Sequence, residues 1–467
     1  MDKIIVEDLI RKVIDDIKNE GKSIEYTQSR FGIFEDMNSA IEASAEAQKK
    51  LYSLSLQQRN EIANIIREVV LKTENLELIS YKAVEETGIG KYEDKIIKNK
   101  VAAEKTPGKE DLITRAISGE YGLMIEEYCP FGVIGSITPT TNPTETIINN
   151  SISMIVGGNT VVFSPHPRAK ETSKLLIKMI NEALEERGAP KNLITMVEEP
   201  SIENTNIMMN HPQIRLLVAT GGPGIVQSVL SSGKKAIGAG AGNPPVVVDR
   251  TADLDNAAKS IVAGASFDNN VPCIAEKEVF ADMNICDLLI HYMKRYGAYE
   301  LTSAETIQQL DELVSQENGK PKTEFVGKSA KYILNKLGVD VPDEIKLIIM
   351  RVGKNHHLVQ EEMMMPILPI VACENVDLAI KYAHEAEHGN RHTAIMHSKN
   401  VDNLSNMAKL LECTIFVKNA PSYAGIGVGG EGSTTFTIAG PTGEGITSAK
   451  SFCRIRRCTI KDSFSIR

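Results

Sequence analysis

GVIGSITP, residues 132–139, is a short apolar run that ends in small and polar residues and precedes a helical pattern over 145–156. Apolar runs of this length are typical of buried strands, and a strand followed by a helix is the first half of a parallel crossover unit. The alternation continues downstream, with strand patterns at 160–164, 193–197 and 214–220 and helical patterns at 169–187 and 202–210. The sequence therefore predicts an α/β fold built on a parallel sheet.

The regions on either side of this alternation differ in character. Upstream, the periodicity is mostly helical, with patterns at 37–51, 56–72 and 76–86. After Gly242 a second α/β stretch runs to about Gly430, and the basic segment SFCRIRRC follows it. At about 150 residues per domain, a chain of 467 residues is long enough for two or three domains.

Composition excludes several classes of function. The chain is 42% hydrophobic and 24% charged, as in an ordinary globular protein, and its net charge of −9 with no tryptophan argues against a nucleic-acid partner. No apolar run approaches the roughly eighteen residues of a membrane span, so we expect no membrane contact. The seven cysteines are scattered without C-x-x-C pairs, which favours a reducing, cytoplasmic location.

Residues 2–20 carry a narrow apolar stripe at helical spacing, formed by Ile5, Leu9, Val13 and Ile17. Gly21 ends the pattern, and a polar segment up to residue 30 separates it from the rest of the chain. One interpretation is a first helix docked on its own domain. The other is a detachable helix that lays its stripe in the groove of a partner.

Small or polar residues follow three of the predicted strands, in the segments TPTTNP (138–143), SPHP (164–167) and TGGPG (220–224). Open α/β sheets bind ligands at the carboxyl ends of their strands. A complete G-x-G-x-x-G fingerprint is absent, and a glycine-rich turn alone is more often a plain turn. Three such segments at successive strand ends favour a dinucleotide site.

HEAEH, residues 384–388, matches the H-E-x-x-H pattern of zinc proteases. Zinc ligands on a helix have to face the protein. Here His384 and His388 fall on the polar side of the helical pattern, together with Asp377 and Lys381. We therefore expect no metal site, and a zinc hydrolase remains only the alternative of another class.

SFDNNVPCIAEKEVF, residues 266–280, contains the candidate nucleophile Cys273. A lone cysteine is more often a small buried side chain than a reactive one. The flanks of Cys273 are polar, however, and Pro272 disfavours a helix at Val271, so the thiol is expected on a constrained turn.

Five segments together resemble one family. They are TPTTNPTETIINN (138–150), ATGGPG (219–224), AIGAGAGNPPVVVD (236–249), FDNNVPCIAEKEV (267–279) and EEMMMPILPI (361–370). In this order and at these separations they resemble the aldehyde dehydrogenase superfamily, and more narrowly its coenzyme-A-acylating branch. The resemblance runs from about Phe31 to the end of the chain.

The resemblance implies a role for each candidate residue. Cys273 attacks the aldehyde carbonyl as a thiolate, and the amide of Asn142 with the backbone N–H of Cys273 donates to the oxyanion. A hydride is then transferred to the nicotinamide, and the acyl group remains bound to the sulfur as a thioester. Residues implied in cofactor binding are Thr138, Pro139, Ser164, Pro165, His166, Thr220, Gly221, Gly222, Pro223, Gly224, Gly240 and, at the nicotinamide ribose, Glu362.

Two departures from the family pattern affect the expected reaction. Hydrolytic members have a glutamate that activates water, whereas its place here falls at Ala239 or beside it. Without that base a thiol is the better acyl acceptor, so coenzyme A is the expected co-substrate and an acyl-CoA the product. A hydrolytic dehydrogenase that releases the free acid is the alternative. The second departure is SPHP, where the family often has an acid at the adenosine ribose. Without this acid the 2′-phosphate of NADP is not repelled, so NADP is not excluded, although NAD is expected.

His392, in GNRHTA, matches a histidine of the acylating branch and is a candidate for taking a proton from Cys273 or from the coenzyme thiol. A solvated loop histidine is the other interpretation. Relatives in the branch use aldehydes of two to four carbons, and propionaldehyde is favoured here.

The resemblance also implies a layout and partners. A homodimer or homotetramer is expected, because an exposed arm pairs with the sheet of another subunit. In microcompartment relatives an amphipathic helix and a polar linker precede the enzyme, so residues 2–20 are expected to bind a shell protein inside a bacterial microcompartment. The expected parts are a targeting helix (1–20), a linker (21–30), a Rossmann-like NAD-binding domain (30–112 and 132–241), an α/β catalytic domain (242–438) and a β oligomerisation arm (113–131 and 439–467).

Overall fold

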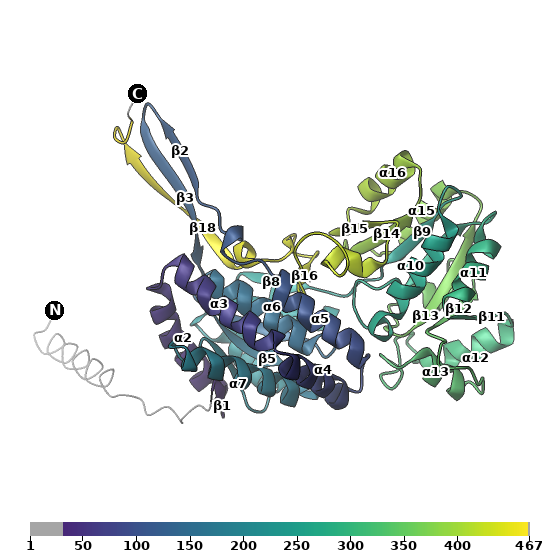
Figure 1. Ribbon diagram of the computed structural model, residues 1–467, viewed down its shortest axis with the longest axis horizontal. Coiled ribbons are helices and arrows are strands. Elements are labelled where there is room, and N and C mark those ends of the chain that lie inside the picture. Colours follow the sequence, from purple (N-terminus) through teal and green to yellow (C-terminus); the bar gives the residue numbers. More distant parts are fainter. Residues whose placement is uncertain (1–30, 466–467) are drawn as a thin grey trace, which may run out of the picture.

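The computed structural model describes residues 31–465, and the expected helix and linker of residues 1–30 lie outside this range. The chain forms two lobes and a projecting arm (Figure 1). The first lobe contains a six-stranded parallel sheet. Its strands lie in the order β1 (Ile33–Phe34), β6 (Ile194–Val197), β5 (Thr160–Pro165), β4 (Val133–Thr138), β7 (Ile214–Thr220) and β8 (Ala236–Ala239).

Helices complete the first lobe. They are α2 (Met37–Tyr52), α3 (Leu56–Leu71), α4 (Thr73–Thr87), α5 (Tyr92–Lys105), α6 (Pro143–Val156), α7 (Lys170–Glu186), α8 (Ile202–Asn210) and α9 (Pro223–Leu230), with short 3-10 turns at Lys109–Asp111 and Pro167–Ala169. The predicted strand at 132–139 and the predicted helix at 145–156 are β4 and α6. Every residue of both is buried; β4 is mostly apolar, whereas α6 also buries polar side chains, among them Glu145, Asn149 and Asn150. Pro143 starts α6 at a position where its missing N–H costs nothing.

The second lobe contains a seven-stranded parallel sheet. Its strands lie in the order β11 (Ala298–Leu301), β12 (Leu347–Arg351), β13 (Ile367–Cys373), β10 (Glu278–Asp282), β9 (Pro245–Val248), β14 (Thr393–His397) and β15 (Ile415–Lys418). Its helices are α10 (Leu254–Ser266), α11 (Cys286–Arg295), α12 (Ala304–Val314), α13 (Ala330–Lys336), α14 (His357–Gln360), α15 (Val376–Ala386) and α16 (Val401–Leu411). The 3-10 turn η3 (Phe267–Asn270) joins α10 to the segment that carries Cys273.

The arm is a three-stranded antiparallel sheet in the order β18 (Cys453–Lys461), β3 (Gly122–Pro130) and β2 (Arg115–Gly119). It extends away from the first lobe as a long ribbon (Figure 1). Between the second lobe and β18 the chain returns across both lobes through η4 (Ser422–Ile426), β16 (Ile438–Ala439), β17 (Gly445–Ile446) and η5 (Ala449–Phe452). We call residues 422–452 the strap.

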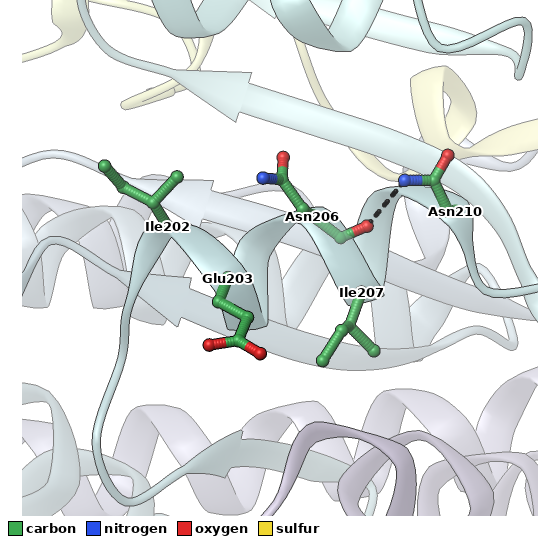
Figure 2. A pocket seen from close by; sticks show the side chains of 5 residues that line it. All are labelled: Ile202, Glu203, Asn206, Ile207 and Asn210. Carbon is green, nitrogen blue, oxygen red and sulfur yellow. Dashed lines mark hydrogen bonds between the residues drawn. The ribbon is translucent and has the colours of Figure 1, made fainter.

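The surface of α8 is hollowed on one side, and only side chains of this helix line the hollow: Ile202, Glu203, Asn206, Ile207 and Asn210 (Figure 2). None of these residues belongs to the predicted site. Within residues 31–465, none of the helices combines the length and the apolar character that crossing a bilayer requires.

Candidate active site

The predicted cofactor segments lie along one edge of the first sheet. Because its strands are parallel, their carboxyl ends meet there, and the register places Thr138 beside Pro165 and Thr220 beside Ala239. Ile137 of the central strand is paired with Ala219. The three segments that the sequence singled out therefore follow neighbouring strands, in the arrangement of a dinucleotide edge.

Polar groups along this edge fit a bound dinucleotide. Thr138 is buried, and its Oγ1 has no hydrogen-bond partner within the described part of the chain. Ser164 shares a 2.8 Å hydrogen bond with Thr205 of α8, and Thr220 shares one of 2.9 Å with Thr437 of the strap. Pro139 is half-buried, and His166 is exposed beyond the end of β5.

The glycine segment leads into α9, which starts at Pro223 with Gly222 as its N-cap. A Cβ at Gly222 or Gly224 would meet no atom of residues 31–465 within 4 Å. Packing therefore does not demand glycine at these positions, whereas close approach of a phosphate to free backbone N–H groups does. Gly221 and Gly240 are half-buried on the same edge.

The turn before Cys273 has an unusual backbone. Asp268, Asn269 and Asn270 have φ angles of 49°, 54° and 64°, a left-handed run that non-glycine residues rarely adopt. Side-chain hydrogen bonds hold it in place: Asn269 donates to Gly327 O at 2.8 Å, and Asn270 donates to the carbonyls of Ala265 and Glu276. A constrained turn therefore precedes Cys273, but its cause differs from the predicted one, because Val271 before Pro272 keeps helical angles of φ −70° and ψ −38°.

Charged groups of opposite sign surround the thiol. Lys277 is buried, donates to the carbonyl of Asn270 at 2.8 Å and lies 3.8 Å from the carboxylate of Glu362. Burial, followed by the charge of Glu362, raises the pKa of the Cys273 thiol to about 12, and Lys277 opposes the shift. Burial also raises the pKa of Glu362 to about 7. The free thiol is therefore protonated at neutral pH and requires a base when it attacks.

His392 is 1% exposed, so the interpretation as a solvated loop histidine is wrong. Its Nδ1 lies 2.8 Å from the hydroxyl of Thr393, while its buried Nε2 finds no hydrogen-bond partner among the described residues. Burial lowers the pKa of His392 to about 4, so the ring is neutral. A Cβ at Gly242 would lie 2.7 Å from Cys273 O and 3.0 Å from the His392 ring, which places the histidine against the cysteine turn.

Asn142 is the N-cap residue of α6 and is 6% exposed. Its Oδ1 accepts a 2.6 Å hydrogen bond from Lys98 Nζ. Its Nδ2 makes only a long contact of 3.4 Å, with the hydroxyl of Thr141. The amide nitrogen is therefore available to donate to a reacting oxygen.

The structure adds residues that sequence reasoning did not assign to the site. Lys277 belongs to the charged run after Cys273, which the sequence shows without indicating that it folds inward. Lys95 and Lys98 lie in a helix with a weak apolar stripe, and Glu145 and Asp268 lie in the polar segments PTETIINN and SFDNNVP. No local pattern therefore indicated that these four side chains are buried. Their pairing across distant segments was not readable.

Two sequence alternatives can be placed in the structure. Ala239, at the expected place of the water-activating acid, is buried at the end of β8. His384 and His388 are exposed, and α15 ends at Ala386, so His388 has left the helix and donates to Gln360 O at 2.9 Å. In the part of the chain that the structure covers, no group of three or more His, Cys, Asp or Glu side chains is arranged to hold a metal ion.

Comparison with known proteins gives consistent matches. Residues 25–445 match the model of the aldehyde dehydrogenase family. The chain is 46% identical over 99% of its length to a CoA-propanoylating propanal dehydrogenase of Salmonella typhimurium, of which it covers 99%.

Two solved structures are also similar. One is the Rhodopseudomonas palustris propionaldehyde dehydrogenase with bound CoA and an acylated cysteine, at a TM-score of 0.93 and 58% identity, with coverage of 94% of this chain and 100% of that one. The other is a propionaldehyde dehydrogenase from the fucose utilisation microcompartment of Clostridium phytofermentans, at a TM-score of 0.91, 51% identity and coverage of 93% and 100%. The predicted fold is confirmed, and the chain belongs to the aldehyde dehydrogenase family, in its coenzyme-A-acylating branch.

Proposed function

We propose that this enzyme oxidises propionaldehyde, or another aldehyde of two to four carbons, to its acyl-CoA, with Cys273 as the nucleophile. The acylating oxidation with NAD(P) and coenzyme A is the activity of the branch. The choice of aldehyde is supported by the relatives that are named for propanal and propionaldehyde. The observation that carries the site is the turn of Cys273, which follows a left-handed run and lies against the buried His392.

In the first step the Cys273 thiol loses its proton as Sγ bonds to the carbonyl carbon, and the carbonyl π electrons move to oxygen. The Nε2 atom of His392 is the proposed proton acceptor, because the ring is neutral and Nε2 has no other described partner. In this role the ring carries its proton on Nδ1, which donates to the Thr393 hydroxyl. Asn142 Nδ2 and the backbone N–H of Cys273 donate to the oxyanion. When bound, the dinucleotide supplies a nicotinamide ring that accepts the hydride expelled as the carbonyl re-forms.

The second step moves the acyl group from one sulfur to another. The thiol of coenzyme A releases its proton to solvent, and its thiolate adds to the thioester carbon. The same two donors again face the oxyanion, and the Cys273 Sγ–carbon bond breaks. The leaving sulfur recovers a proton from His392. Ala239 offers no carboxylate that could activate water, so hydrolysis lacks a base at this position. Glu362 is proposed to bind the nicotinamide ribose, and the segment Gly221–Gly224 the pyrophosphate.

One assay tests the proposal. Propanal and NAD are incubated with enzyme in the presence and absence of coenzyme A, and reduced cofactor, propionyl-CoA and propionate are measured. We expect turnover at least about a hundredfold faster with coenzyme A and little free acid. Propionate formed at full rate without coenzyme A would establish the hydrolytic alternative.

A variant tests the nucleophile in the same assay. Cys273→Ser is expected to lower kcat at least about a thousandfold, because a serine hydroxyl at this position has no thiolate chemistry. Cys458→Ser, at an exposed cysteine of the arm, is the matched control and should keep full activity. Equal activity of the two variants would exclude Cys273 as the nucleophile.

The expected partners and location extend the proposal. The enzyme is proposed to work inside a bacterial microcompartment, with residues 2–20 bound to a shell protein. Support comes from the microcompartment origin of the Clostridium phytofermentans relative and from the apolar stripe of the segment. Fusion of residues 1–20 to a reporter should make the reporter co-purify with shells. A fusion with Leu9→Asp and Val13→Asp should not.

A further inference from the structure

Four titratable side chains of opposite charge type are buried together where the two lobes meet: Lys95, Lys98, Glu145 and Asp268. We call them the buried ion cluster. All four are at most 1% exposed, and they come from α5, α6 and η3. Lys98 lies 2.6 Å from Asp268 and 3.0 Å from Glu145, and Lys95 lies 3.0 Å from Asp268. Such clusters cost desolvation energy that apolar packing does not, so stability alone is a weak reason for one.

Lys98 connects the cluster to the proposed oxyanion donor. An ammonium group has three N–H donors and no acceptor, and those of Lys98 face Asn142 Oδ1, Asp268 and Glu145. With Oδ1 of Asn142 held at 2.6 Å from a cation, rotation of the amide by 180° would place its NH₂ group against the ammonium. The contact therefore fixes which end of the amide points to the substrate.

Asp268 connects the same cluster to the second oxyanion donor. It lies five residues before Cys273, in the left-handed run of η3. Its Oδ1 accepts a 2.7 Å hydrogen bond from Lys91 N, and its Oδ2 accepts one of 2.6 Å from Lys98. The buried ion cluster therefore contacts the Asn142 side chain through Lys98, and it holds the turn that leads to the Cys273 backbone donor through Asp268.

We propose that Lys98 is a positioning residue for the reaction, which orients the Asn142 amide toward the oxyanion and couples it to the Cys273 turn through Asp268. This inference rests on the proposed roles of Asn142 and Cys273. Preorganised donors stabilise a developing oxyanion because they need no reorientation during the reaction. Loss of Lys98 should therefore act on steps that form an oxyanion, and should affect other reactions of the thiol only through the thiolate fraction, which the charge of Lys98 raises.

The chain offers a matched control in Lys95. It shares Asp268 and Glu145 with Lys98, but it donates to the backbone carbonyl of Thr141 and not to the Asn142 side chain. The test pair is Lys98→Met/Glu145→Gln, and the control pair is Lys95→Met/Glu145→Gln. Each pair removes one cation and one carboxylate from the cluster, so each leaves the same net charge.

Two measurements decide the proposal in the full-length enzyme with propanal, NAD and coenzyme A. The test pair should have a kcat/KM about 10- to 100-fold below that of the control pair. The loss is smaller than on removal of an oxyanion donor, because the Asn142 amide is misoriented but still present. When Asn142→Ala is added to both, the difference should vanish, since Lys98 would have no amide left to orient. A difference that persists in the Asn142→Ala background would overturn the proposal, as would equal kcat/KM values for the two pairs.

Alkylation of Cys273 by iodoacetamide separates positioning from general damage to the site. This substitution at a saturated carbon forms no oxyanion, so test and control pairs should react within about threefold of each other once each rate is corrected for the thiolate fraction, which the charge of Lys98 also raises. A loss as large as that in kcat/KM would contradict the proposal. If the test pair does not fold, Lys98→Gln/Glu145→Gln is compared with Lys95→Gln/Glu145→Gln, with and without Asn142→Ala, by the same criteria. Failure of the proposed function itself would be seen in the wild type, as absence of CoA-dependent turnover.

Discussion

The Cys273 thiol lies between groups whose effects on it oppose each other. Burial and Glu362 raise its pKa to about 12, whereas Lys277 favours the thiolate. With such a pKa only about one molecule in 10⁵ carries a thiolate at neutral pH. From the sequence, polar flanks were expected around the cysteine, and the family resemblance implied attack as a thiolate. In the structure these flanks turn inward and bond to the backbone, so proton removal has to accompany attack on the carbonyl.

Replacement of Glu362 tests this electrostatic balance. Glu362→Gln removes the neighbouring negative charge, so the pKa of Cys273 should fall and alkylation by iodoacetamide at about pH 8 should accelerate several-fold. The wild-type rate should rise about tenfold per pH unit, because the thiolate is the reacting form and its pKa lies far above the assay range. Glu361→Gln, at the exposed neighbour, is the control and should react like the wild type. A slower reaction of Glu362→Gln would contradict the assignment.

The regular elements of the first lobe were largely predictable from sequence. The patterns at 202–210 and 214–220 coincide with α8 and β7. In β7 the apolar run records burial, whereas α8 is mostly exposed and buries only Met208 and Met209. The left-handed run in η3 was not predictable, since asparagine and aspartate adopt this conformation only when tertiary hydrogen bonds compensate. The contact of Lys98 with Asn142 spans 44 residues of sequence and has no local signature.

The arm carries apolar side chains that no described residue covers. Ile455 is 63% exposed on the edge strand β18, and Tyr121 is 80% exposed at the β2–β3 turn. Exposed edges and exposed apolar residues on one sheet are typical of surfaces that pair with another chain. We therefore propose that the arm joins subunits, as the sequence led us to expect.

Substitution on β18 tests the arm. Ile455→Asp places a charge on the surface proposed to be buried between subunits, so the protein should sediment as a smaller species than the wild type. Ile202→Asp is the matched control, because Ile202 is 82% exposed on α8 (Figure 2) and lies outside the arm. A mutant at Ile455 with an unchanged sedimentation coefficient would argue against this interface.

The two lobes are held together by the strap as well as by the buried ion cluster. Glu276, three residues after Cys273, accepts hydrogen bonds of 2.8 and 2.7 Å from the backbone and hydroxyl of Ser422 at the start of the strap. Further along, Lys105 of the first lobe donates to the carbonyls of Gly427 and Gly430, both at 2.7 Å. The catalytic turn, the strap and the first lobe are therefore linked, and titration of Glu276 should affect global unfolding.

Burial raises the pKa of Glu276 from 4.5 to about 7, so the folded protein holds a proton there that the unfolded chain releases earlier. The stability from this group is complete below pH 4.5 and is lost as the pH rises through 7. Glu276→Gln imitates the protonated form and should unfold like the wild type near pH 5. Near pH 8 its free energy of unfolding should exceed that of the wild type by up to about 3 kcal/mol.

Glu431→Gln, at an exposed strap position, should follow the wild type at both pH values. Thermal and urea unfolding of the three proteins measure the effect, and a gap between Glu276→Gln and the wild type that does not widen with pH would show that Glu276 is ionised in the fold.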